Sequence, residues 1–321
     1  MRVARSVGVR EVRVETDPDP RPGPGDVVCR VLACGVCGSD VADAWVAPKL
    51  PVVLGHELTA EVEAVGAEVA GLRAGDRVVV HHHAPCGACR RCRRGHETLC
   101  ERFRETALDP GGFAERVRVP ADLVGELLAL DGLDAERGTF VEPLACVLRA
   151  FARCRLRAGD SLLVVGAGTS GLLAIAAAHA RGVEAVWVRE PRPERLERAL
   201  GLQAERHGNE LVDVVLCCRS APAALADGFA AVAPGGVLCV YAPPAPGRDL
   251  ALDGLSLYRR EVDVVASYSA GPGDMRAAHA LLASGAVDPA PWITHRLGLE
   301  ETGRALELAR SGEAVKALVV P

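Results

Sequence analysis

Residues 161–180 read SLLVVGAGTSGLLAIAAAHA, and this stretch decides the fold of the second half of the chain. The run LLVV is short and fully apolar, as is typical of a strand buried on both faces of a parallel sheet. The run LLAIAAAHA has the length and apolar pattern of a helix. Further apolar runs follow at 185–188, 212–218 and 237–242, with a helical segment at 193–200. Strands that alternate with helices predict βαβ units, a parallel sheet and an α/β fold.

A G-x-G-x-x-G motif lies between the first strand and the first helix of this region. Gly166 permits a tight turn, Gly168 lets the backbone approach a pyrophosphate, and Gly171 lets the helix pack closely on the strand. The free N–H groups at the start of that helix attract an anion. The motif therefore predicts a dinucleotide site formed by Gly166, Gly168, Thr169, Ser170 and Gly171.

An acidic residue follows the second strand, at Glu190, nineteen residues beyond Gly171. A carboxylate at this position accepts the ribose hydroxyls of NAD and repels the 2′-phosphate of NADP. Arg189 and Arg192 flank it, and an arginine here can instead hold a 2′-phosphate. We expect NAD, with Glu190 and Arg192 in the site, and keep NADP as the alternative.

The first part of the chain has a different pattern. Short β-type runs at 10–15 and 26–32 are separated by the turn-forming segment DPDPRPGPG, and similar runs continue to about residue 145. We therefore expect a mainly β domain over 1–145 and a dinucleotide-binding domain over 146–268. The last segment, 269–321, has helix and strand patterns and is expected to return to the first domain.

Four cysteines crowd into fifteen residues, with the spacing Cys86-x2-Cys89-x2-Cys92-x7-Cys100. Four thiolates complete a tetrahedral zinc site and leave no position open for water, so this zinc would be structural. The arginines between them offset the thiolate charge. An iron–sulfur cluster is the alternative metal group, and unligated thiols are the alternative without metal.

A second set of candidate ligands is dispersed along the chain. One thiolate, one imidazole and one or two carboxylates form the kind of zinc site that keeps an open position for chemistry. Taken singly, each residue has an ordinary structural explanation, and spacing alone does not join them. The set consists of Cys37, Ser39, Asp40, His56, Glu57 and Glu142.

Composition excludes several classes of protein. The net charge of −5 provides no basic field for nucleic acid, and no apolar run is long enough to span a membrane. The N-terminal residues lack the apolar core of a signal peptide, so we expect a cytoplasmic protein. Lys49 and Lys316 are the only lysines among 37 basic residues, which we attribute to genomic base composition.

Together these motifs resemble the zinc-containing medium-chain alcohol dehydrogenases, and Glu142-Pro143-Leu144 is similar to the sorbitol and threonine dehydrogenase branch. The resemblance implies a GroES-like β-rich catalytic domain, a doubly wound Rossmann domain, an active site in the cleft between them, and a homodimer or homotetramer. It implies NAD and two zinc ions per chain. Cys37 and His56 would bind the catalytic zinc, with Glu57 and Glu142 as further candidates. Asp40 would orient His56, and Ser39 would take the proton of a secondary alcohol.

The chain departs from this family at two places. Many relatives carry a histidine that completes the proton relay where Ala42 stands here, so the proton must leave through water, the ribose or a residue such as Asp43. The stretch 198–212 is too short for a full strand and helix, so we expect a truncated edge strand. The tract His81–His83 is either metal-binding or the end of a strand that enters the cysteine loop, and we favour the strand. An NADP-dependent carbonyl reductase and a non-catalytic relative remain the alternative functions.

Overall fold

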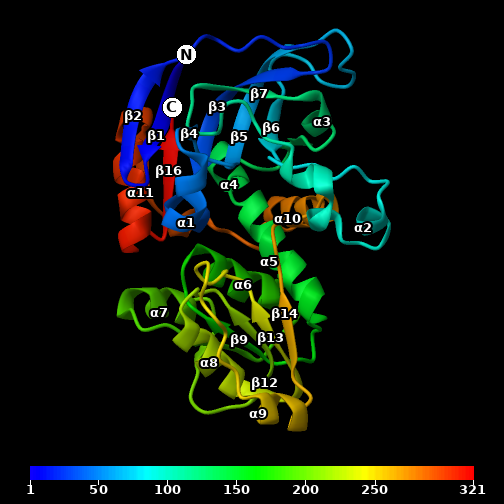
Figure 1. Ribbon diagram of the computed structural model, residues 1–321, viewed down its shortest axis with the longest axis vertical. Helices are drawn as coiled ribbons and strands as arrows, with labels where there is room; N and C mark the ends of the chain where they lie inside the picture. Colours follow the sequence, from blue (N-terminus) through cyan, green and yellow to red (C-terminus); the bar gives the residue numbers. More distant parts are fainter. The chain divides into compact units, whose positions relative to one another are not determined.

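The computed structural model describes residues 1–321, which divide into two compact units (Figure 1). One unit contains Met1–Glu142 and Gly271–Pro321, and the other contains Pro143–Ala270. The C-terminal segment thus belongs to the same unit as the N-terminal half. The domain limits that we expect from the sequence, at residues 145 and 268, remain a proposal.

The first unit is built on two sheets. A three-stranded sheet has the order β2-β1-β4, and a larger sheet has the order β15-β16-β3-β5-β6-β8, with β7 paired to β3. The strands are β1 (Arg2–Gly8), β2 (Glu11–Thr16), β3 (Val27–Gly35), β4 (Val52–Val53), β5 (Glu57–Val65), β6 (Arg77–Val80), β7 (Arg116–Val119), β8 (Leu128–Ala129), β15 (Ile293–Gly298) and β16 (Lys316–Val320). Strand β1 was not singled out from the sequence.

Helices in this unit are mostly single turns. They are α1 (Asp43–Val46), α2 (Arg90–Arg93), α3 (Ala121–Val124), α4 (Ala135–Gly138), α10 (Pro272–Ala283) and α11 (Thr302–Ser311). The 3-10 turns are η1 (Gly38–Val41), η2 (Ala47–Lys49), η3 (Glu97–Leu99), η4 (Glu101–Arg104), η5 (Ala290–Trp292) and η6 (Leu299–Glu301). The core between them is mainly aliphatic, because valine, leucine and alanine supply most of the buried side chains.

The second unit is a six-stranded parallel sheet with the order β11-β10-β9-β12-β13-β14. Its strands are β9 (Leu162–Val165), β10 (Val186–Arg189), β11 (Glu205–Arg206), β12 (Val212–Cys217), β13 (Val232–Val240) and β14 (Asp263–Ala266). Its helices are α5 (Val141–Cys154), whose first two residues belong to the first unit, α6 (Thr169–Ala180), α7 (Pro193–Leu200), α8 (Pro222–Ala231) and α9 (Gly254–Arg259). This order is that of the doubly wound dinucleotide-binding sheet.

The expected truncation of the edge strand is confirmed. Strand β11 has two residues, and the chain passes from it to β12 without a helix. Four strands on the other side of β10 keep full pairing. The loss is therefore confined to the edge of the sheet and spares the turn after β9.

Strand register explains how distant residues of the first unit come together. Gly35 at the end of β3 pairs with Glu57 at the start of β5. On its other side the same residue pairs with Leu318 of β16. The segment after β3, the segment before β5 and the start of β16 consequently meet at one end of the sheet.

Candidate active site and metal centres

Three candidate zinc ligands converge at this end of the sheet. Cys37 lies just after β3 and caps η1, while His56 and Glu57 lead into β5. Their ligand atoms, one sulfur, one nitrogen and one oxygen, all lie within 4.8 Å of one another. Cys37 and His56 are partly exposed, whereas Glu57 is buried. A mixed donor set with an accessible side fits a catalytic rather than a structural zinc.

Asp40 holds two of the converging groups in place. Its Oδ1 lies 3.4 Å from Nδ1 of His56, and its Oδ2 accepts a hydrogen bond of 3.0 Å from the backbone N–H of Cys37. Burial disfavours its ionisation, but the imidazole of His56 and backbone N–H groups together outweigh this effect and keep the pKa of Asp40 below its ordinary value. The same contact leaves the other ring nitrogen of His56 for a metal, as is usual for zinc-bound imidazoles.

Lys316 is a site residue that the sequence analysis missed. Its ammonium forms an ion pair with the carboxylate of Glu57, and the two side chains are 1% and 2% exposed. It also donates to the carbonyl of Val36 at 3.4 Å. Burial alone would lower the pKa of Lys316, but Glu57 raises it above the ordinary value. The sequence contained one signal for this residue, because Lys316 is one of only two lysines in a chain whose other basic residues are arginines.

Glu142 and Ser39 occupy different positions from the converging group. Glu142 is 6% exposed in the first turn of α5, and the group of mutually close ligand atoms does not include it. Ser39 is exposed on η1, two residues after Cys37. Asp43, the alternative exit for a proton, lies 3.5 Å from Arg310 in an ion pair.

The four cysteines of the 86–100 loop also converge. Their sulfurs lie within 4.8 Å of one another, and backbone N–H groups point at them, such as the N–H of Cys89 at 3.3 Å from Sγ of Cys86. Hydrogen bonds from the N–H groups of Ala88 and Cys89 lower the pKa of Cys86 to about 6. Burial raises the pKa of Cys92 to about 12. A cluster of four thiols with N–H donors on sulfur fits a tetrahedral zinc.

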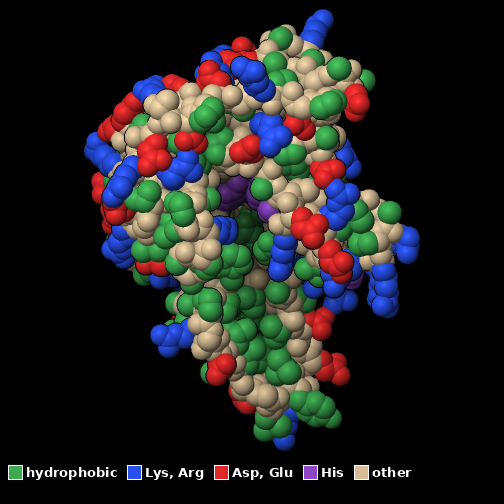
Figure 2. Space-filling model, turned by 45° about the horizontal axis from the view of Figure 1, so that its top comes forward, with side chains coloured by type: hydrophobic (Ala, Val, Ile, Leu, Met, Phe, Trp, Pro, Cys, Tyr) green, Lys and Arg blue, Asp and Glu red, His purple; other side chains and the backbone are tan.

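The tract His81–His83 follows β6 and leads toward the cysteine loop. The favoured prediction of a strand is wrong for the histidines themselves, because β6 ends at Val80. The ring of His82 lies 4.7 Å from that of His56 and 4.1 Å from that of His83. Burial is the main cause of a lowered pKa in all three histidines. The pKa of His81 is lowered to about 3 and that of His83 to about 4, and the pKa of His82 lies well below its ordinary value. Figure 2 shows histidine side chains within a hollow of the face that it draws.

The glycine turn of the second unit has the geometry that its sequence requires. Gly166 adopts a φ of 99°, which disfavours other residues. A Cβ on Gly171 would lie 1.9 Å from the carbonyl oxygen of Gly166, whereas a Cβ on Gly168 would meet nothing closer than 3.7 Å. Thr169 and Ser170 form the first turn of α6. The turn therefore needs Gly171 for packing and leaves the space at Gly168 open.

Glu190 lies at the end of β10 and contacts this turn. Its Oε2 accepts a hydrogen bond of 2.8 Å from the N–H of Ala167, and its Oε1 accepts one of 2.9 Å from the N–H of Arg192. The side chain is 8% exposed. Each oxygen keeps a second lone pair, so the carboxylate remains able to accept a ribose hydroxyl. Glu190 thus fixes the turn of the glycine motif.

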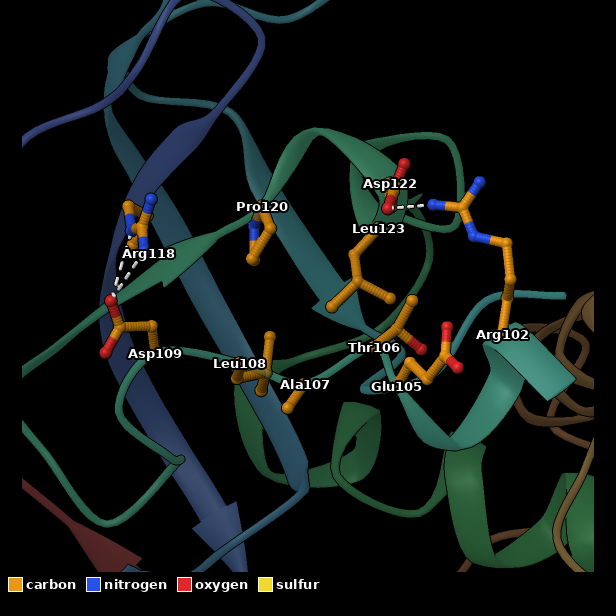
Figure 3. A pocket seen from close by; sticks show the side chains of 10 residues that line it. All are labelled: Arg102, Glu105, Thr106, Ala107, Leu108, Asp109, Arg118, Pro120, Asp122 and Leu123. Atoms are coloured by element: carbon orange, nitrogen blue, oxygen red, sulfur yellow. Dashed lines mark hydrogen bonds and ion pairs between the residues drawn. The ribbon is translucent and has the colours of Figure 1, made fainter. Parts of the chain in front are cut away.

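A cavity of about 350 Å³ lies elsewhere in the first unit, next to β7 and α3 (Figure 3). Two ion pairs border it, Arg118 with Asp109 at 2.8 Å and Arg102 with Asp122. Leu108 and Leu123 are among its apolar lining residues. None of the predicted site residues lines it, so it is not the candidate active site.

Comparison with known proteins shows the family of the chain. Residues 23–129 match the alcohol dehydrogenase GroES-like domain. Sorbitol dehydrogenase of Bacillus subtilis is 31% identical, with 100% of this chain and 97% of that protein covered.

Solved structures cover the whole fold. The alcohol dehydrogenase of Thermus sp. ATN1 has a TM-score of 0.87 at 32% identity, with 100% of this chain and 99% of that one covered. The 2R,3R-butanediol dehydrogenase of Bacillus subtilis has a TM-score of 0.87 at 26% identity over the same shares of the two chains. No helix here is both long and apolar enough to cross a membrane. The chain belongs to the zinc-containing medium-chain alcohol dehydrogenase family and is an oxidoreductase.

Proposed function

We propose that this enzyme transfers a hydride between a secondary alcohol of the polyol class and NAD, with catalysis at Cys37 and His56. The observation that carries the proposal is the convergence of Cys37, His56 and Glu57 within 4.8 Å, with Asp40 behind His56. The likeness to sorbitol and butanediol dehydrogenases supports the choice of polyols and diols as substrates. Cyclitols and amino alcohols belong to the same chemical class of secondary alcohols, and a threonine dehydrogenase is also among the relatives.

Each residue has a distinct task in this proposal. Cys37 and His56 hold the metal, Asp40 fixes the ring of His56, and the ion pair with Lys316 holds the carboxylate of Glu57 beside them. A zinc ion held by these residues would supply Lewis acidity and so lower the pKa of the substrate hydroxyl. Ser39 accepts the hydroxyl proton and passes it to solvent, which its exposure on η1 permits. Glu142 remains a candidate for an alternative ligand of the catalytic zinc.

The second unit binds the cofactor. The turn formed by Gly166, Gly168 and Gly171 and the first turn of α6 hold the pyrophosphate, while Glu190 accepts the ribose hydroxyls. A dinucleotide held there would supply the hydride acceptor, and the protein would provide its position. We further propose that the four-cysteine loop holds a second, structural zinc, that the enzyme is a dimer or tetramer, and that it acts in the cytoplasm.

A substrate panel with two variants tests the proposal. The zinc-loaded protein is assayed with NAD on sorbitol, 2,3-butanediol and myo-inositol, by absorbance of the reduced cofactor. Turnover on at least one of them is expected, and Cys37→Ser and His56→Ala should each abolish it while the four-cysteine loop keeps its metal. Full turnover in either variant would show that the metal-ligand assignment is wrong.

A further inference from the structure

The imidazole of His82 is a polar group beside the candidate ligands that the proposed reaction does not use. Its ring lies 4.7 Å from that of His56, at an angle of 49°. Its Nδ1 is buried without a hydrogen-bond partner, although the residue as a whole is partly exposed. Buried polar atoms in folded proteins almost always have a partner. A hydrogen-bonding group from outside the chain would supply the missing partner.

The two neighbouring histidines hold His82 in position. Nδ1 of His83 lies 2.9 Å from the carbonyl of Thr106, and its ring packs 4.8 Å from Phe103. His81 is fully buried and meets His82 edge-on, with the ring centroids 5.7 Å apart. Of these three rings, His82 is the one that contacts His56. The rings of His81 and His83 therefore fix the position of the His82 ring. Its remaining ring contact is with His56, one of the candidate zinc ligands.

A second metal ion does not explain this arrangement. The ligand atoms that converge at this end of the sheet belong to Cys37, His56 and Glu57, and no histidine of the tract is part of that group. A neutral imidazole offers one donor and one acceptor, which a hydroxyl group matches in both directions. An alkyl group at the same place would leave the ring nitrogen without a partner. The geometry therefore favours a hydroxylated organic ligand.

We propose that His82 is a specificity-determining residue that hydrogen-bonds the second hydroxyl of a vicinal diol or polyol. The carbinol that reacts lies at Cys37 and His56, and the neighbouring hydroxyl is one carbon–carbon bond away, on the side of His82. This inference rests on the proposed function and adds the residue that distinguishes polyols from simple alcohols. A substrate without the second hydroxyl leaves His82 unpartnered and binds less well.

The test compares two substrates that differ by one hydroxyl, 2,3-butanediol and 2-butanol. His82→Phe keeps an aromatic ring and removes both nitrogens, and His82→Gln restores a donor and an acceptor. The ratio of kcat/KM for the diol to that for 2-butanol should fall about 10- to 100-fold in His82→Phe, as expected when one hydrogen bond to a bound hydroxyl is lost. Most of the change should be in KM, and His82→Gln should recover part of the ratio.

His295→Phe is the matched control, because this partly exposed histidine of β15 lies outside the group of candidate ligands and should not change the ratio. Zinc content of every variant is measured, and a crystal of the zinc-loaded protein soaked in 2,3-butanediol should place a diol oxygen within hydrogen-bond distance of His82. An unchanged ratio in His82→Phe, or an equal fall for both substrates, would overturn the inference. If the unmodified enzyme instead acts on neither alcohol nor any polyol, the proposed function itself fails.

Discussion

Lys316 and Glu57 form a buried ion pair that joins β16 to β5 across β3, directly beside the candidate zinc ligands. The pair ties the C-terminal strand of the chain to a site built from its first 60 residues. Because both side chains are almost completely inaccessible, neither charge can be compensated by water once its partner is removed.

We predict that Lys316→Met lowers the free energy of unfolding by about 3–5 kcal/mol, because the carboxylate of Glu57 is left buried without a cation. The double variant Lys316→Met/Glu57→Gln should recover most of this loss. Urea denaturation followed by circular dichroism measures both. The other lysine provides the control, since Lys49→Met changes an exposed side chain and should stay within about 0.5 kcal/mol. A Lys316→Met protein as stable as the unmodified enzyme would contradict the prediction.

The variant Asp40→Asn tests whether the carboxylate of Asp40 helps His56 to bind zinc. The variant keeps the shape of the side chain but loses the charge that faces Nδ1 of His56. Zinc affinity at this site should fall about 10- to 100-fold, as for other partners of metal-bound histidines. Competition with a chromophoric chelator measures the affinity, and the four-cysteine loop should keep its zinc. Equal loss from both sites would instead indicate general unfolding.

Two glycines of the same motif should behave differently. In Gly168→Ala the new methyl group meets no atom closer than 3.7 Å, so the protein should fold normally but bind NADH at least tenfold more weakly, because the methyl group obstructs the pyrophosphate. In Gly171→Ala the methyl group would clash with the carbonyl of Gly166, so thermal stability itself should fall. Thermal unfolding and fluorescence titration with NADH separate the two effects. Equal stability of the two variants would argue against the packing role of Gly171.

Zinc binding to the four-cysteine loop should release protons. Without metal the pKa of Cys92 is about 12, so this thiol is protonated at neutral pH and must lose its proton to bind zinc. Cys86, with a pKa of about 6, is already a thiolate at pH 7 and becomes protonated only below about pH 6. The loop's zinc affinity should therefore decrease as the pH falls, most steeply once Cys86 also takes up a proton.

Calorimetric titration of the zinc-free protein in two buffers of different ionisation enthalpy measures the number of protons released. At least one proton per zinc is expected at pH 7. A Cys92→Ser variant provides the comparison and should release fewer. Zinc binding without proton release would mean that Cys92 is not a ligand.

The sequence predicted the second unit well because its signals are local. The apolar strand β9, the glycine turn and helix α6 are contiguous, and α7 begins and ends where the pattern placed it, at Pro193 and Leu200. The first unit was predicted in outline only. Strand β1 mixes arginine and serine with its buried residues, so its sequence has no clear strand signal.

The active-site prediction depended on the family resemblance, because its residues come together through strand register. Spacing along the chain does not show that Gly35 pairs with both Glu57 and Leu318, and that pairing brings Lys316 to the site. The sequence likewise does not connect His82 with the site, since its contact with His56 exists only in three dimensions. The four-cysteine loop needed no such information, because its ligands lie within fifteen residues.

The most direct test of the account is a crystal structure of the zinc-loaded enzyme with anomalous scattering measured at the zinc absorption edge. We predict two zinc ions per chain, one in the four-cysteine loop and one bound by Sγ of Cys37 and a ring nitrogen of His56. Zinc in the loop alone, in protein that still oxidises alcohols, would contradict the proposed catalytic site.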